Sequence, residues 1–369
     1  GRGSGGFTDH GGGSWGPDCW TEAPLDRMCT PLLARVNPET GKLYVIDENN
    51  VPDYFGARIL VFSPPFANGQ PADRVIRAQV EGNLEPWDIP YFFTAHTLEF
   101  NQFKEGEYAD GVIWVNEHAA QGQRTTLLDD DGEVVALIGA RHPLEQGGDS
   151  AYWPDGCGDI NEGFRLWWPI GSIGFDDDDN IYLADEFFYQ VTRYGLPYTL
   201  VPNGDGTCLP DPNGGFLGPN PYSRAKFWET VGMVADRGQI IVRDWRRTRV
   251  WNDYMSTSMG AEADYLIPIG GLAHHAVDDQ RRLWTADEHT RLTVFQLPII
   301  EDDQQPLRVD VQLYWQDSGE AVEFEAFGLA FDDITKTLWV GDRHRILRVS
   351  NYNDIGGRLE VDMVLGQRD

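Results

Sequence analysis

The sequence predicts an all-β protein: a six-bladed β-propeller with four antiparallel strands per blade and a Gly-rich N-terminal extension. Three observations lead to this fold class. Six short apolar segments each end in an acidic residue, each belongs to a unit of four apolar segments separated by turn signals, and helical periodicity is nearly absent. A unit of four short strands exposes both faces of a small sheet, so radial packing of the units is what buries those faces.

The composition agrees with many strands and turns. The chain has 369 residues, with 41 Gly, 22 Pro and 13 Trp, whereas a disordered chain would lack the aromatic residues. A formal net charge of -30 disfavours nucleic acid and anionic membrane surfaces as partners. Every apolar run is shorter than the roughly 18 residues that span a bilayer, so we expect no membrane insertion.

The repeated acids are the most regular feature of the chain. They are Asp47, Glu117, Asp185, Asp244, Asp287 and Asp342. In five units an aromatic residue stands three positions earlier, namely Tyr44, Trp114, Tyr182, Trp284 and Trp339. An Arg follows most of the acids. Because the acid occurs in every unit, we interpret it as structural: it closes the turn between the second and third strands and pairs with that Arg. The competing hypothesis is a ring of catalytic carboxylates.

The pattern apolar–Asp–short turn–Arg–Val–apolar resembles the NHL repeat. The stretches "ARILVFSPPFANGQPADRVI" and "VLGQRD" are similar to the secreted bacterial members of that family. The resemblance covers roughly residues 30–369, which we take as the propeller, and leaves residues 1–29 as the extension. The resemblance implies the propeller fold. It does not imply one function, because NHL propellers serve as scaffolds, as ligand binders and, in some branches, as enzymes.

The cysteines indicate an oxidising compartment. The four residues are Cys19, Cys29, Cys157 and Cys208, and none forms a C-x-x-C pair. An even count, wide spacing and a start at Gly1 suggest a secreted protein with two disulfides, the chain being either a processed mature form or one trimmed for expression. We favour the pairs Cys19–Cys29 and Cys157–Cys208, while the other pairings, and four buried thiols, stay open.

Two acidic stretches are candidate calcium sites. "DDDDN" holds Asp176 and Asp178 at a predicted hairpin tip, and "NGDGTCLPD" holds Asn203 and Asp205 with oxygen ligands at alternate positions. The second stretch lacks a bidentate Glu at the twelfth position. The simpler reading of "DDDDN", and of "DDDGE" at residues 129–133, is a solvated acidic turn. Calcium is the only cofactor that the sequence suggests.

The mouth of the central channel is where propeller enzymes carry out their chemistry. Counting back equally along the predicted inner strands brings six residues to that mouth: Leu32, His96, Gly171, Thr230, Ala273 and Phe327. Among these His96 is the good metal ligand, and a slip of one residue in the fifth unit would add His274. "AHTLEF" resembles the zinc-ligand motif of peptide-amidating lyases, and calcium-dependent lactonases need a Glu and several Asn or Asp there. A hydrolytic metal site needs about three protein ligands, so we expect His96 to be a hydrogen-bonded channel residue.

Three long loops join the outer strand of one unit to the inner strand of the next, at roughly residues 63–94, 141–168 and 203–228. They carry Trp87, Trp153, Trp167, Trp168 and Trp228. Such aromatics serve as interface anchors or stack on sugars, although they could instead cover the loops themselves. We therefore predict a non-catalytic extracellular or cell-surface module, which binds protein or polysaccharide or assembles with itself, with calcium as its metal. The alternative is a metal-dependent lyase or lactonase with its site at the channel.

Overall fold

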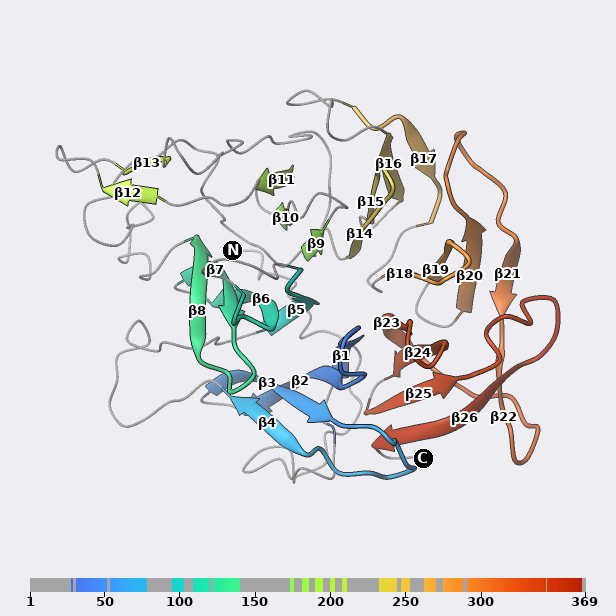
Figure 1. Ribbon diagram of the computed structural model, residues 1–369. Coiled ribbons are helices and arrows are strands. Elements are labelled where there is room, and N and C mark those ends of the chain that lie inside the picture. The colour runs from blue at the N-terminus through green and yellow to red at the C-terminus, as the bar shows by residue number, and fades with distance from the viewer. Residues whose placement is uncertain are drawn as a thin grey trace, which may run out of the picture.

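The computed structural model describes a ring of small β-sheets (Figure 1). The residues that it describes are 28, 31–51, 54–77, 95–102, 109–119, 122–139, 173–175, 181–185, 190–194, 200–202, 208–210, 232–243, 247–252, 262–269, 275–287, 291–342 and 344–366. Within these ranges all regular structure is β, as the sequence predicted, and no helix is long and apolar enough to cross a membrane.

Five complete blades surround the axis, four of them with four strands and one with five. We name them A to E in chain order. Blade A holds β1 (Pro31–Val36), β2 (Leu43–Val51), β3 (Tyr54–Phe62) and β4 (Arg74–Arg77). Blade B holds β5 (Ala95–Phe100), β6 (Ile113–Ala119), β7 (Gly122–Leu128) and β8 (Val134–Gly139). Blade C holds β14 (Gly232–Asp236), β15 (Gln239–Arg243), β16 (Thr248–Asn252) and β17 (Tyr265–Ile267). Blade D holds β18 (Ala276–Val277), β19 (Arg282–Asp287), β20 (Arg291–Gln296) and β21 (Arg308–Val311).

Between blades B and C, where the sequence predicts the third of six blades, lies a sheet of three strands. These are β9 (Ile173–Phe175), β10 (Ile181–Asp185) and β11 (Gln190–Tyr194), and β9 contacts both β5 and β14. The segment predicted as the fourth strand of this unit, β12 (Leu200–Pro202), instead pairs with β13 (Cys208–Pro210) in a separate sheet. The described residues thus contain five complete blades, not six, because β12 pairs with β13 and does not join the sheet of β9, β10 and β11.

Blade E departs from the predicted four antiparallel strands. It contains β22 (Leu313–Trp315), β23 (Ala326–Asp332), β24 (Thr337–Asp342), β25 (Arg345–Val349) and β26 (Leu359–Gly366). The added strand β22 pairs with β26 in parallel. The sequence predicts "VDVQLYW" as a single strand, but the chain crosses at Gln312 from blade D to blade E. The side-chain amide of Gln312 donates to the carbonyls of Leu313 and Val322 and so fixes the crossing.

Side chains that alternate between the two faces of the second strand in each blade build the core between blades. On β2, Tyr44 and Ile46 pack against blade B, whereas Leu43 and Val45 pack against blade E. Successive side chains of a strand point to opposite faces, so every blade is apolar on both sides. The predicted aromatic column is confirmed as core: Tyr44, Trp114, Tyr182, Trp284 and Trp339 are all at most 1% exposed.

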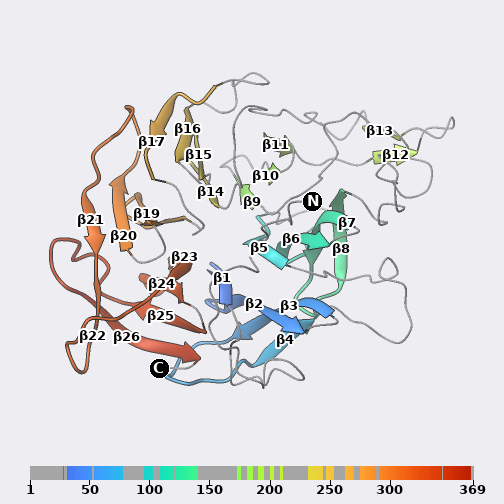
Figure 2. The same cartoon turned by 180° about the vertical axis from the view of Figure 1, so that it is seen from behind.

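The first and last blades close the ring side by side, as both views show (Figures 1 and 2). Strand β1 packs on β23. The connection from β3 to β4 reaches β26, where Asn68 Oδ1 accepts from Val364 N at 2.9 Å and Gly69 N donates to Val364 O at 3.1 Å. Met28, which the sequence assigns to the extension, is 3% exposed and packs in the core between blades A and E. The remainder of residues 1–29 lies outside the described part of the chain.

Candidate functional site

A β-bulge marks the start of the inner strand in three blades. The pairing with the second strand skips one residue between Pro31 and Leu33, between Ala95 and Thr97, and between Ala326 and Gly328. The residues left out are Leu32, His96 and Phe327. These are three of the positions that counting along the sequence brings to the channel mouth. Bulges redirect a side chain and are common at rims and beside active sites.

The other positions at the mouth are less fully described. Gly171, Thr230 and Ala273 lie outside the described residues, as does His274. His275, immediately before β18, is buried. Ala276 pairs with Trp284 as Glu99 pairs with Trp114, so Ala276 and Glu99 hold equivalent positions in their blades. His275 is therefore equivalent to Leu98, which follows His96 by two positions along the inner strand. His275 therefore cannot take the equivalent place at the mouth.

Arg35 occupies the channel-facing edge of the ring below the bulges. Its Nη1 donates to Leu329 O at 2.7 Å and to Ala34 O at 3.2 Å, and its Nε lies 3.1 Å from Glu99 Oε2. Ala34 and Leu329 hold equivalent places on inner strands, since they pair with Val45 and Val340. An inner strand has a neighbour on one side only, so carbonyls that do not pair with the second strand face the axis.

This guanidinium joins three neighbouring inner strands, β1, β5 and β23. The side chains of Arg35 and Glu99 are 11% and 24% exposed. Arg35 lies three positions after the bulge at Leu32, which is about 10 Å along a strand. The bulges therefore lie at the beginnings of the inner strands, and the Arg35–Glu99 pair joins these strands further along.

The described residues do not complete a metal site. Among them, no group of three or more His, Cys, Asp or Glu side chains could hold a metal ion. The predicted calcium residues Asp176, Asp178, Asn203 and Asp205 lie outside the described part of the chain, although "DDDDN" does fall between β9 and β10, as predicted for a hairpin tip.

The other predicted site residues are also beyond the description. Cys19, Cys29 and Cys157 lie outside it, and the structure describes Cys208 only by its backbone, as the first residue of β13. The predicted interface residues Trp87, Trp153, Trp167, Trp168 and Trp228 lie outside it as well. The disulfide pairing and the aromatic interface remain predictions.

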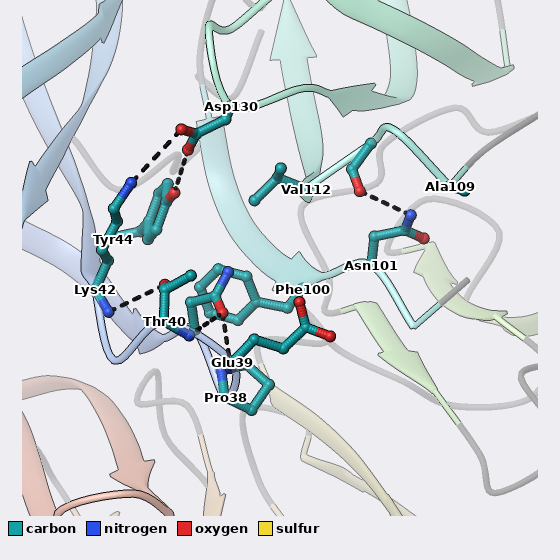
Figure 3. Close-up of a pocket in the computed structure, with 12 residues that line it drawn as sticks. Pro38, Glu39, Thr40, Lys42, Tyr44, Phe100, Asn101, Ala109, Val112 and Asp130 are labelled. Carbon is teal, nitrogen blue, oxygen red and sulfur yellow. Dashed lines mark hydrogen bonds and ion pairs between the residues drawn. The ribbon is translucent and has the colours of Figure 1, made fainter. Parts of the chain in front are cut away.

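A polar pocket of about 210 Å³ lies between blades A and B (Figure 3). The turn between β1 and β2 forms its rim with Glu39, Thr40 and Lys42, and Phe100 and Val112 form an apolar wall. The pocket begins where β1 and β5 end, at Asn37 and Asn101. It is therefore at the opposite end of the inner strands from the bulges.

The acidic turn at residues 129–133 supplies the far side of this pocket. It is the turn between β7 and β8, as predicted, and Asp129 Oδ1 accepts from Asp131 N and Glu133 N at 2.9 and 2.8 Å. Asp130 is more than a solvated turn residue. Its carboxylate accepts from Tyr44 Oη at 3.0 Å, and it pairs with Arg74 at 3.1 Å and with Lys42 at 3.5 Å.

These contacts shift the acidity of both partners. Burial, and then the charge of Asp130, raise the pKa of Tyr44 above its usual range. Burial pushes the pKa of Asp130 upward, but the Tyr44 hydroxyl, Arg74 and Lys42 together outweigh it and hold that pKa below its usual value. At neutral pH the pair is a phenol donating to a carboxylate, and it holds blade A against blade B.

Sequence reasoning missed Arg35, Glu99 and the pocket. One signal was present: Arg35 and Glu99 occupy the same column of the repeat, opposite the aromatic residues Tyr44 and Trp114. Opposite charges in one column of adjacent units indicate a contact between neighbouring inner strands. The pocket left no such signal, because its walls come from turns that only the packing of two blades brings together.

Comparisons with known proteins give likenesses of structure alone. No family model matches the chain, and no curated protein matches it. A gluconolactonase from Xanthomonas campestris is 17% identical, with 88% of this chain and 87% of that chain covered and a TM-score of 0.47. A second structure, provisionally named a gluconolactonase, is 12% identical, covers 92% and 91%, and has a TM-score of 0.49. PorZ, a surface component of the type-IX secretion system of Porphyromonas gingivalis, is 11% identical; the match covers 92% of this chain and 39% of that one, with a TM-score of 0.39.

The prediction of a non-catalytic binding or structural module is corrected by these comparisons. Two of the three solved structures named above carry the name of an enzyme, gluconolactonase, whereas a non-catalytic module was predicted. Because the identities are below 25% and the TM-scores below 0.5, they do not assign an activity to this chain.

Proposed function

We propose that the chain is a hydrolase of the lactonase type with its site at the mouth of the central channel. The observation that carries this proposal is the bulge shared by the inner strands of blades A, B and E, which in blade B falls on His96. A bulge is costly to a strand pair and recurs where a side chain must leave the sheet pattern. The gluconolactonase names supply only the substrate class to test first.

The reaction adds water to the lactone carbonyl carbon and breaks the ring C–O bond, which leaves a hydroxy acid. Such a step needs a base to take the proton of the attacking water and a donor to the developing oxyanion. Histidine has an ordinary pKa near 6.5 and is the side chain best suited to that base at neutral pH. We assign that role to His96; the Arg35–Glu99 pair lies about 10 Å further along the inner strands.

The test uses the whole chain and D-glucono-1,5-lactone. Acid release is followed with a pH indicator and corrected for spontaneous hydrolysis, with calcium, zinc or a chelator added in separate arms. We expect turnover above the spontaneous rate and a loss of about 100-fold or more in kcat in His96→Ala. His344→Ala, a histidine in the β24–β25 turn, is the matched control. Turnover no faster than the spontaneous reaction, or an unchanged rate in His96→Ala, would overturn the proposal.

We also propose that the three-stranded sheet β9–β11 is the inner part of a sixth blade and that the repeats are of the NHL type. Its support is the contact of β9 with β5 and β14, the inner strands of blades B and C. The Asp–Arg pairs at Asp47–Arg58 and Asp342–Arg345 support the repeat assignment. A crystal structure with six radial sheets is the expected result, and five sheets in the ring would contradict it.

A secreted, disulfide-bonded form is a further proposal from the four cysteines. Thiol titration of the denatured protein before and after reduction tests it. We expect no reactive thiol before reduction, and four free thiols at that stage would rule it out.

A further inference from the structure

We propose that the pocket between blades A and B binds a single neutral sugar ring. The site is separate from the proposed lactonase centre, because the pocket lies at the ends of β1 and β5 and the bulges lie at their beginnings. Figure 3 shows Glu39, Lys42 and Asp130 arranged around the opening, with Phe100 behind them. Nothing in the lactonase proposal requires this second site.

The charges around the pocket disfavour an ion as the ligand. Its lining contains the carboxylates of Glu39 and Asp130, which repel an anion, and the ammonium of Lys42, which repels a cation. Asp130 is also compensated by Arg74 and Lys42. A neutral polar ligand avoids both repulsions.

The hydrogen-bonding groups suit a polyol, whose hydroxyls both donate and accept. Lys42 has three N–H donors, and the Thr40 hydroxyl accepts from Lys42 N at 3.3 Å and can still donate. Asn37 commits its Oδ1 to the turn, which leaves Nδ2 as a donor. Tyr44 donates to Asp130, and its oxygen, which Arg74 also approaches, keeps a second lone pair as an acceptor. The apolar C–H face of a sugar ring matches the wall of Phe100 and Val112.

The size of the pocket limits the ligand to one ring. Its volume of about 210 Å³ is below the roughly 300 Å³ at which drug-sized pockets begin. A single ring with its hydroxyls suits a pocket of this size, whereas a disaccharide would extend beyond the opening.

The polar groups are fixed before any ligand arrives. Asn37 Oδ1 accepts from Glu39 N at 2.9 Å and from Thr40 N at 3.0 Å, which holds the rim turn in one conformation. Gly41 in the same turn has φ +68°, in the left-handed region that suits glycine. In the apolar wall, the Phe100 ring meets the Tyr44 ring edge to face with centroids 5.2 Å apart. A pre-ordered site loses less entropy on binding.

The experiment is saturation-transfer NMR on the whole chain with D-glucose, D-galactose and D-mannose as neutral probes. D-Glucuronate and D-glucosamine serve as the anionic and cationic comparisons. We expect transfer to at least one neutral sugar and at least tenfold weaker binding of its charged counterpart. Ala109→Trp places an indole at an exposed position of the rim, fills the pocket and should abolish the signal.

Lys42→Met removes one donor and should weaken binding about tenfold. Its matched control is Lys336→Met, which removes an exposed lysine paired with Asp333 and Asp279 near the turn between β23 and β24, and should leave binding unchanged. His96→Ala should also leave it unchanged, so that failure here is distinct from failure of the lactonase proposal. No transfer to any neutral sugar, or transfer that persists in Ala109→Trp with an unchanged melting curve, shows a hydrated crevice and overturns the inference.

Discussion

Asp47 and Arg58 face each other across the β2–β3 hairpin, with Arg58 Nη2 2.7 Å and Nε 2.8 Å from Asp47 Oδ2. Neither side chain is more than 4% exposed. The hairpin continues past this pair to Val51 and Tyr54, so Asp47 does not close the turn in blade A, which corrects the predicted location. In blade E, Asp342 and Arg345 do flank the turn and form the same kind of pair.

Removal of the Asp47 carboxylate should destabilise the fold strongly. Asp47→Ala leaves the Arg58 charge buried without its partner, which costs about 3–5 kcal/mol in the free energy of unfolding. The control is Arg291→Ala, since the Arg291–Asp310 pair is 62% and 61% exposed and such pairs contribute about 0–1 kcal/mol. Urea unfolding followed by tryptophan fluorescence measures both. Similar losses in the two variants would contradict a structural role for the acid.

Two buried tryptophans should respond differently to the same change. Trp284 Nε1 donates to Asp278 Oδ2 at 2.7 Å, whereas Trp339 Nε1 has no hydrogen-bond partner among the described residues. Both rings are 0% exposed, so the loss of volume on substitution by Phe is similar in the two. Trp284→Phe should therefore lose about 1.5–3 kcal/mol more than Trp339→Phe, the contribution of a hydrogen bond to a charged group. Chemical denaturation of the two variants gives the difference, and equal losses would refute the assigned bond.

Alkaline pH should weaken the contact between blades A and B through Tyr44. Its pKa is raised in the folded chain, while an unfolded tyrosine titrates near pH ~10. Below that pH both states keep the proton and stability does not depend on this group. Above it the unfolded chain releases a proton that the folded chain holds, so the free energy of unfolding falls by up to about 1.4 kcal/mol per pH unit.

Tyr44→Phe removes this dependence. Between about pH 8 and about pH 11 the variant should lose less stability than the wild type, although at neutral pH it starts lower by about 1 kcal/mol because the bond to Asp130 is gone. Tyr352, whose pKa is also raised by burial and by Asp279, should behave alike. Urea unfolding across this pH range is the measurement, and identical slopes for wild type and Tyr44→Phe would contradict the assignment.

Much of the fold could be predicted from the sequence, because the residue patterns that indicate strands and turns are local. The alternation in "LYVI" at residues 43–46 predicts a strand that is buried on both faces, and β2 packs in that way against blades B and E. Turn residues such as Asp129 predict a hairpin tip, and the β7–β8 turn is there. The repeat itself predicts a propeller. Each of these inferences needs only the period of a strand or the preference of a turn residue.

What failed depended on partners distant in sequence. The segment at residues 308–315 divides between blades D and E, and Leu200–Pro202 pairs with β13 instead of β11. Either edge would satisfy the hydrogen bonds of such a short strand, so its own residues cannot select the partner. The third unit therefore reads as a complete blade in the sequence, although the structure pairs its fourth strand elsewhere.

The sequence by itself determined the β class, the repeated unit, the buried aromatic column and, in blades A and E, the pairing of the repeated acid with the following Arg. Only the tertiary structure decided that the bulges fall on Leu32, His96 and Phe327, that Arg35 reaches Glu99 and Leu329, and that Tyr44 meets Asp130 beside a pocket. The reason is physical: strand period and turn geometry are set by neighbours along the chain, whereas these contacts exist only once whole blades pack against one another.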